Sequence, residues 1–202
     1  MTGKELIKRY NDGDRDFSGA DLIGSDLSGA KLTWATLTGA NLRGASFSGS
    51  DLSWATLIRA NLIEATLTGS NLSGANFSGS DLTGATLIRA NLIEATLTGS
   101  TLIGAEIKDV KWPSPTMVLL ADWGKVSDDL TRDLMRLDAA CHPNPAAFDR
   151  WVDGGGPCPY EDVNVQRAAS FAERKECWKP GRPPKIYNLM CRVLEEKCVL
   201  GG

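Results

Sequence analysis

Histidine and cysteine are scarce in this chain of 202 residues. There is a single histidine, His142, and all five cysteines lie after residue 140. The first 140 residues therefore offer neither imidazole nor thiol for nucleophilic or zinc chemistry. The cysteines show no C-x-x-C spacing, and their odd number without framework spacing indicates reduced thiols in a cytoplasmic protein.

Long apolar runs are missing as well. No stretch approaches the ~20 apolar residues that a membrane span needs. No extended apolar region follows Lys4, as a secretory signal peptide would require. We therefore expect a cytoplasmic protein that does not enter a membrane.

Strong charge of either sign is also absent. Nine acidic residues outnumber six basic ones over residues 15–109, and the flanking segments are balanced, so the net charge of -3 lies on this stretch. Nucleic-acid binding depends on clustered Lys and Arg, and we therefore expect none here.

What the sequence has instead is a period of five. From Arg15 to Asp109 it forms 19 consecutive pentapeptides without a gap, such as ADLIG at residues 20–24. The third, central position is always large and apolar. The first position is Ala or Ser apart from Arg15, the second is polar, and Gly predominates at the fifth.

A period of five fits neither a helix nor a strand. On a helix, successive central residues would advance by roughly 140°, so no apolar face would form. A strict repeat instead predicts a solenoid, in which each unit buries its apolar residue by stacking on its neighbours. The unbroken series of Leu and Phe also argues against disorder, the usual state of Gly- and Ser-rich stretches.

The repeat resembles the A(D/N)LXX motif of the pentapeptide-repeat family, over about half of the chain. The resemblance implies a β-solenoid, namely a right-handed quadrilateral pentapeptide β-helix with four pentapeptides per coil. Positions twenty residues apart would then share an interior column, as Leu22, Leu42 and Leu62 would. At ~4.8 Å per layer, this tower would be roughly 23 Å tall.

Three domains are expected: a short N-terminal cap helix over 1–14, the β-helix over 15–111, and an α-helical C-terminal module over 112–202. Thr2 and Glu5 form a capping box, and the helix would cover the open edge of the first coil. In the module we expect helices over 127–141, about 145–152, 162–178 and 185–199.

The two prolines after Trp112 are expected to end the repeat. A few apolar residues would be sufficient as a lid on the last coil: Trp112, Met117, Val118, Leu119 and Leu120. The helices after Ser127 exceed what capping requires. We therefore expect the module to provide the main surface for a partner or for self-association. In the second case the protein would form a homodimer.

Several large side chains are candidates for an interaction surface. Trp34 and Trp54 are twenty residues apart and would stack in one exterior column, and Ile63 lies in a second exterior column. The tryptophan pair either binds a partner or is covered by the C-terminal segment, and the sequence leaves both open. Trp151 and Trp178 are further candidates in the module.

One internal segment is duplicated. Residues 55–70 recur without change as 85–100, an offset of one and a half coils, so that Arg59 and its copy Arg89 would face opposite sides. Duplication of DNA without a selected function is the simplest interpretation.

Candidate catalytic and metal residues are few. Cys141 and His142 are neighbours, and neighbours on a helix point about 100° apart, so they do not form a nucleophile–base pair. These two residues with Cys158 and Cys177 could meet around zinc, but the spacing matches no common site and buried thiols are the simpler interpretation. We predict no enzyme activity, no cofactor and no metal.

The sequence thus favours a non-enzymatic protein-interaction scaffold with an unknown protein partner. The resemblance supplies an alternative, because quinolone-resistance members of the family mimic DNA and bind a type II topoisomerase (gyrase). Those members are longer, strongly acidic and dimeric through their C-termini, and this chain has fewer coils and little net charge.

Overall fold

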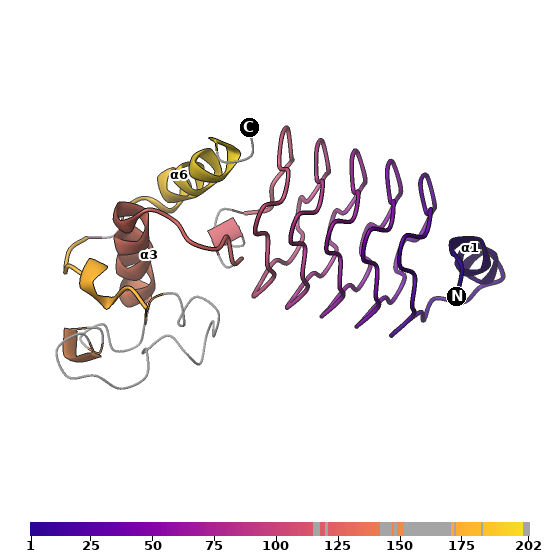
Figure 1. Cartoon of the computed structure of the whole chain (residues 1–202), viewed down its shortest axis with the longest axis horizontal. Helices are drawn as coiled ribbons and strands as arrows, with labels where there is room; N and C mark the ends of the chain where they lie inside the picture. Colours follow the sequence, from indigo (N-terminus) through magenta and orange to yellow (C-terminus); the bar gives the residue numbers. More distant parts are fainter. Residues whose placement is uncertain are drawn as a thin grey trace.

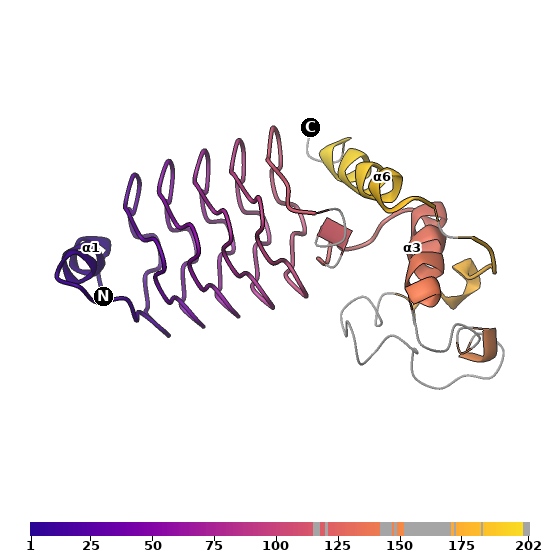
Figure 2. The same ribbon diagram turned by 180° about the vertical axis from the view of Figure 1, so that it is seen from behind.

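The computed structural model describes residues 1–114, 118–119, 121–141, 147, 149–151, 171, 173–182 and 184–199. The molecule is elongated (Figure 1), with a stack of coils between helix α1 (Gly3–Asn11) at one end and helices α3 (Asp128–Cys141) and α6 (Ile186–Val199) at the other. The view from behind shows the same order along the axis (Figure 2).

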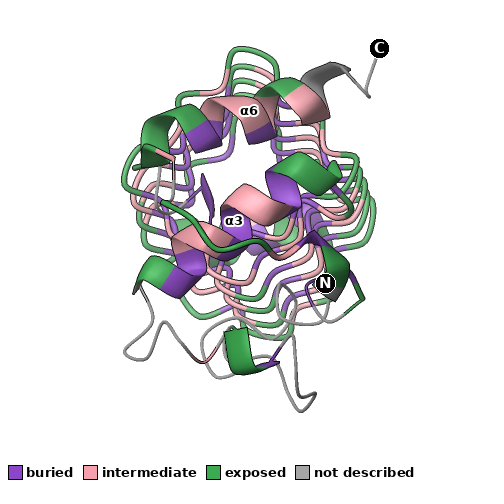
Figure 3. Cartoon of the chain, turned by 90° about the vertical axis from the view of Figure 1, so that its left-hand side faces the viewer, coloured by how far each residue is buried: buried purple, intermediate pink, exposed green. Residues whose placement is uncertain are grey.

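The coils are joined by parallel β-bridges between second positions twenty residues apart, as from Asp21 to Asn41 and on to Asn61. The central residue that follows a bridged second position also donates its N–H to the next coil, as from Leu22 to the carbonyl of Asn41 at 2.8 Å. An offset of twenty residues contains four pentapeptides, so each coil has four sides, which the view along the axis shows (Figure 3).

The interior of the tower is filled by the central residues, all of which are buried from Phe17 to Ile107. The alanines of the first position lie beside them. Where a buried Ser replaces Ala, the hydroxyl is paired locally, as in Ser50, whose Oγ donates to the carbonyl of Phe47 at 2.7 Å. Ser can therefore occupy a buried first position without leaving a polar atom unpaired.

The polar residue of the second position stabilises the turn that follows it. The carboxylate of Asp16 accepts from the backbone N–H of Ser18 at 2.9 Å and from its hydroxyl at 2.6 Å. The Ser18 hydroxyl, with the backbone N–H of the same residue, lowers the pKa of Asp16. Asp and Asn make this bond to the residue two positions on, which explains their frequency at the second position.

Helix α1 confirms the Thr2 half of the expected capping box. The Oγ1 of Thr2 accepts from the backbone N–H of Glu5 at 3.2 Å. The helix ends at Asn11, three residues before the predicted end of the segment.

The apolar side of α1 lies directly on the first coil. Leu6 and Tyr10 are buried, and the Tyr10 hydroxyl donates to the carbonyl of Thr33 at 3.0 Å. A Cβ added at Gly3 would lie 2.7 Å from the carbonyl oxygen of Asp26, so only glycine permits this close approach. The open edge of the first coil is thereby covered.

The repeat extends past the expected boundary after residue 111. Lys111 bridges to Asn91, and Trp112 follows it at the central position and packs against the core. Pro113 takes the fourth position, whose N–H makes no bond between coils, and proline is therefore tolerated there.

One further rung forms after residue 120. Asp122 bridges to Thr101 with an offset of 21 residues, and Trp123 follows it as a buried central residue. The rings of Trp112 and Trp123 meet edge to face with centroids 5.6 Å apart. Together with the buried Val118 they cover two interior columns, and the Trp123 indole N–H donates to the Val118 carbonyl at 2.9 Å.

The expected lid is thus present in part. Trp112, Val118 and Leu119 pack against the core, whereas Met117 and Leu120 lie outside the described residues. Trp123 was not among the expected residues. Its signal in the sequence was the triplet Ala-Asp-Trp at 121–123, which repeats the first three positions of the code.

The predicted helices over 127–141 and 185–199 are α3 and α6, which pack against each other. Ser127 caps α3, because its Oγ accepts from the N–H of Leu130 at 3.4 Å. The carboxylate of Glu196 accepts from the N–H of Ser127 at 2.6 Å and from its hydroxyl at 2.7 Å. These bonds join the start of α3 to the end of α6.

Within the predicted helix over 162–178, Phe171 is helical, but the prediction is wrong for residues 173–178. Residues 173–177 form a turn and the short 3-10 helix η1 (Lys175–Cys177), with the N–H of Arg174 donating to the carbonyl of Phe171 at 3.0 Å. The Arg174 side chain is buried and donates to the carbonyl of Val126. Residues 147 and 149–151 are helical, and the rest of the segment predicted over 145–152 lies outside the described residues.

Candidate interaction surfaces

The fifth position of every pentapeptide from Arg15 to Asp109 has a positive φ, between 55° and 68°. Glycine takes twelve of these nineteen positions, which explains its frequency in the repeat. The other seven are Trp34, Trp54, Arg59, Glu64, Arg89, Glu94 and Asp109. An L side chain in this conformation costs about 1–2 kcal/mol relative to the right-handed region.

The two tryptophans among them form an exposed pair. Trp34 is 64% exposed and Trp54 is 45% exposed, and their rings lie parallel within 10° with centroids 5.4 Å apart. The expected stacking is therefore present. The alternative of a cover by the C-terminal segment does not hold in the described part of the chain, because both rings are open to solvent.

The tryptophan pair is held in place from both sides. The ring of Trp54 lies over the backbone of Gly74, since a Cβ there would be 2.5 Å from it. Thr33, which precedes Trp34, is fixed by the Tyr10 hydroxyl of α1. The pair is thus an aromatic surface whose backbone is ordered before any partner binds.

Ile63 does not extend this surface. It is half-buried, and it lies two pentapeptides beyond Trp54, which is half a coil and places it on the opposite side of the tower. More exposed isoleucines occur at Ile23, Ile93 and Ile103.

The two candidate tryptophans of the module are less accessible than expected. Trp151 is 3% exposed and therefore belongs to the core of the module rather than to its surface. Trp178 is half-buried, and its indole N–H donates to the carboxylate of Asp149 at 3.0 Å.

Helix α6 exposes two large residues that sequence reasoning missed. Tyr187 is 63% exposed and Ile186 is 38% exposed, whereas Leu189 is fully buried. Their position in the first turn is the reason, because α6 reaches its packing partner only from Leu189 onward.

The described residues offer neither a metal cluster nor a membrane span. No group of three or more His, Cys, Asp or Glu lies close enough there to hold an ion, and no described helix combines the length and apolar composition needed to cross a bilayer. Burial, and then the charge of Asp128, raise the pKa of the Cys177 thiol, which is thereby kept protonated. His142 and Cys158 lie outside the described residues, so the prediction of no metal stays a prediction.

The sequence matches the pentapeptide repeats family, in eight copies, over residues 16–53, 36–74, 45–84 and 80–111. Among solved structures, the chain is similar to a pentapeptide repeat protein from the thylakoid lumen of Arabidopsis thaliana, with 32% identity over 56% of this chain and 77% of that chain and a TM-score of 0.39. A pentapeptide repeat protein from Nostoc matches with 28% identity over 61% of this chain and 96% of that chain, with a TM-score of 0.39.

QnrB1, a plasmid-mediated fluoroquinolone resistance protein, matches with 28% identity over 52% of this chain and 63% of that chain, with a TM-score of 0.19. No curated protein sequence matches the chain.

Proposed function

Because the chain belongs to the pentapeptide-repeat family, we propose that it is a non-enzymatic scaffold that binds another protein, with the β-helix as a rigid support for the binding side chains. The observation that carries the proposal is the exposed stack of Trp34 on Trp54.

The energetics of the pair support a binding role. Each tryptophan occupies a positive-φ position where glycine would relieve about 1–2 kcal/mol of backbone strain. Stacking of the two rings returns about 0.5–1.5 kcal/mol for the pair beyond the area that they bury. Stacking as such thus does little more than offset the backbone strain, whereas Trp is among the residues most enriched at the centres of protein interfaces.

The C-terminal module is the second part of the proposal. Self-association or partner binding through the module is supported by Ile186 and Tyr187, which leave an apolar turn of α6 exposed. The contribution proposed from Trp151 is dropped, because that side chain is buried.

DNA mimicry toward a type II topoisomerase is the weaker alternative. It requires a dense acidic surface, and the tower carries a net charge of only -3, with Arg59 and Arg89 both projecting from its corners. We expect no inhibition of gyrase supercoiling at micromolar protein. Inhibition that weakens steeply with added salt would revive this alternative.

The test of the scaffold proposal replaces both tryptophans with the residue most common at their position. The variant Trp34→Gly/Trp54→Gly keeps the backbone conformation and removes the aromatic surface. The matched control, Arg59→Gly/Glu64→Gly, makes the same change at two other corners. Both proteins should fold, with circular dichroism spectra like that of the parent.

Proteins from the native host that bind the immobilised parent would be purified, and each would be titrated with the parent, the control and the tryptophan variant. We expect at least a tenfold loss of affinity, about 1.4 kcal/mol or more, for the tryptophan variant alone. A partner that binds all three proteins equally would show that the tryptophan pair is not the binding surface.

A further inference from the structure

Every inner coil binds the coil that follows it through a fixed set of backbone groups. On the side of the tower that carries Leu87, the carbonyl of Ala85 accepts from Glu106 at 2.9 Å. The N–H of Leu87 donates to the carbonyl of Glu106 at 2.8 Å, and the N–H of Arg89 donates to the carbonyl of Lys108 at 2.9 Å. Three hydrogen bonds thus fix each rung on this side.

On the last coil the same three groups are the carbonyl of Ala105 and the N–H groups of Ile107 and Asp109. Among the described residues, no backbone group pairs with any of them. The adjoining side is closed, because Asp122 forms a rung on Thr101. Within the described part of the chain, the tower therefore ends with one side covered and the next side open.

A cleft of about 820 Å³ lies at this open side. Its apolar wall comes from Ile88, Leu102, Ile103, Ile107 and Trp123. Charged residues line it as well, three of them basic (Lys108, Lys125, Lys197) and two acidic (Glu106, Asp109). The volume is within the range of about 300–1,000 Å³ that is usual for ligand sites.

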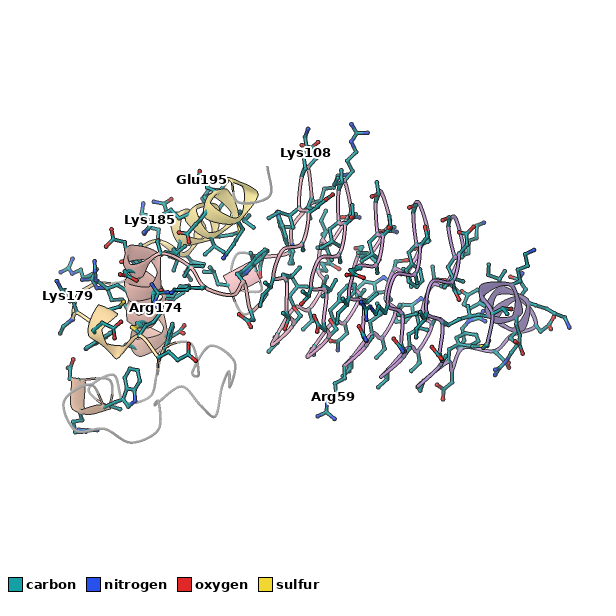
Figure 4. All side chains as sticks on the ribbon, viewed as in Figure 1. Arg59, Lys108, Arg174, Lys179, Lys185 and Glu195 are labelled. Carbon is teal, nitrogen blue, oxygen red and sulfur yellow. The ribbon has the colours of Figure 1, made fainter. Side chains whose placement is uncertain are left out.

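Lys197 approaches the cleft from α6. Its Nζ donates to the carbonyl of Lys125 at 2.6 Å, which ties the end of the helix to the segment after the last rung. Lys108 extends from the tower on the side where α6 lies (Figure 4). The basic side chains thus come from both walls of the cleft, Lys108 from the tower and Lys197 from α6. The unpaired backbone groups of residues 105–109 come from the tower alone.

We propose that this edge binds an extended peptide of a partner protein, which adds one parallel rung beside residues 105–109. The tower itself indicates the chemistry of such a peptide, because each inner coil carries a small residue, a polar residue and a large apolar residue in this order. The apolar residue would lie over Ile107, at the end of the column that contains Leu87. Addition of a strand to an exposed edge is a general mode of peptide recognition.

The charges of the cleft specify the next residue of the peptide. In the tower, the residue after the central one lies in the exterior column of the same side, which here ends at Lys108. An acidic residue at that place would meet Lys108 and the two lysines across the cleft. The predicted ligand is therefore a peptide in extended conformation, with a small, a polar, a large apolar and an acidic residue in this order.

The probe is a fluorescein-labelled synthetic peptide, Gly-Ala-Thr-Leu-Glu-Gly-Ala, titrated into the full chain with fluorescence anisotropy as the readout. The peptide Thr supplies the N–H that would donate to Ala105 and the carbonyl that would accept from Ile107. N-methylation of that Thr removes the donor and should weaken binding about tenfold or more. N-methylation of the Leu is the matched control, because its N–H would point away from the tower, and binding should be retained.

Charge exchange locates the peptide on the protein. The variant Lys108→Glu should bind the probe at least several-fold more weakly, and it should bind a peptide with Lys in place of Glu more tightly than the parent does. The variant Trp34→Gly/Trp54→Gly should bind the probe like the parent. The cleft and the tryptophan pair are thus tested separately. A negative result for one surface does not contradict the proposal for the other.

Amide hydrogen exchange decides the binding mode. Saturating peptide should slow the exchange of the Ile107 and Asp109 amides and leave that of Gly39 unchanged. Equal binding of the two N-methylated peptides, or exchange at Ile107 and Asp109 that is already slow in the free protein, would overturn the proposal.

Discussion

The two ends of the tower are covered in different ways. At the N-terminal end, the nine residues of α1 lie on the first coil, with Leu6 and Tyr10 buried and Gly3 against the backbone of Asp26. At the C-terminal end, the lid around Trp112 and Trp123 is followed by α3 and α6, of fourteen residues each, and no described residue pairs with the backbone of one side of the last coil.

The difference shows how little chain a cap needs. A single amphipathic helix of two and a half turns is sufficient at one end, so covering an edge does not explain the size of the module at the other. Ordering a residue costs roughly 1–2 kcal/mol of backbone entropy, and the module offsets this by packing α3 against α6 and both against the core that continues from the lid. The N-terminal end is thus a cap, and the C-terminal end is a cap joined to a second unit.

The centre of the tower is the reference for both ends, and the largest effect is expected there. Replacing Leu62 with Lys would place a charge in a fully buried column, and we expect the tower to be unfolded at room temperature. The control Asn61→Lys changes a half-exposed second position and should stay folded. Thermal unfolding followed by circular dichroism distinguishes the two, and a Leu62→Lys protein that melts like the parent would refute the assigned register.

At the N-terminal end, the variant Leu6→Ala should lower the free energy of unfolding by about 2–5 kcal/mol, because it leaves a cavity between α1 and the first coil. Lys8→Ala, on the exposed side of the same helix, should change it by less than about 0.5 kcal/mol. Urea denaturation gives both values. Equal, small effects would mean that α1 does not stabilise the tower.

At the C-terminal end, truncation after Lys125 keeps the last rung and removes α3 and α6. We expect the tower to remain folded, with a loss of unfolding free energy smaller than that of Leu6→Ala, because Trp112 and Trp123 are retained. Self-association or partner binding through the module should be lost. A truncated protein that aggregates at once would show that the module is only a larger cap. Both ends of the tower would then have the same role.

The smallest effect concerns pH and the module alone. Hydrogen bonding to Arg174, and then the charge of Arg174, hold the pKa of Asp128 below its ordinary value of 3.8. A lowered folded-state pKa means that this contribution is present above about pH 4 and is lost as pH falls through the folded-state value. The melting temperature of the module should therefore decline with acid more steeply in the parent than in Asp128→Asn.

The variant Arg174→Gln should remove the same acid dependence, although it also lowers stability because the Arg174 side chain is buried. An unchanged acid dependence in both variants would assign the effect to other carboxylates.

The tower could be predicted from sequence because its code is local. Each pentapeptide carries its own central residue, its own polar turn residue and its own fifth position. Each of the nineteen repeats therefore predicts the same local structure independently. The same argument could have identified Trp112 and Trp123. It was not applied past Asp109, because Pro113 and the 21-residue offset to Asp122 hide the period.

The module resisted prediction for the opposite reason. Periodicity and capping signals located α3 and α6, where the apolar face and Ser127 coincide. The outcome at Trp151 and Arg174 depends on contacts between segments distant in sequence, such as Arg174 with Val126, and no local pattern encodes these. Stacking of the tryptophan pair in one exterior column could be predicted, but whether the C-terminal segment covers it could not. Its place among positive-φ residues could be inferred only after the turn geometry was known.

The geometry of the fifth position also determines how such a tower can grow. The stem of Arg59 leans over Gly79, with 3.6 Å from its Cγ to the place of an added Cβ, and Glu64 lies over Gly84 in the same way at 3.7 Å. A bulky residue at a corner thus needs a small residue at the corner one coil later. Insertion or deletion of whole pentapeptides preserves the period of five and moves each corner residue by quarter turns. Duplication can therefore present old side chains in new directions without refolding the protein, as the copies at 55–70 and 85–100 illustrate.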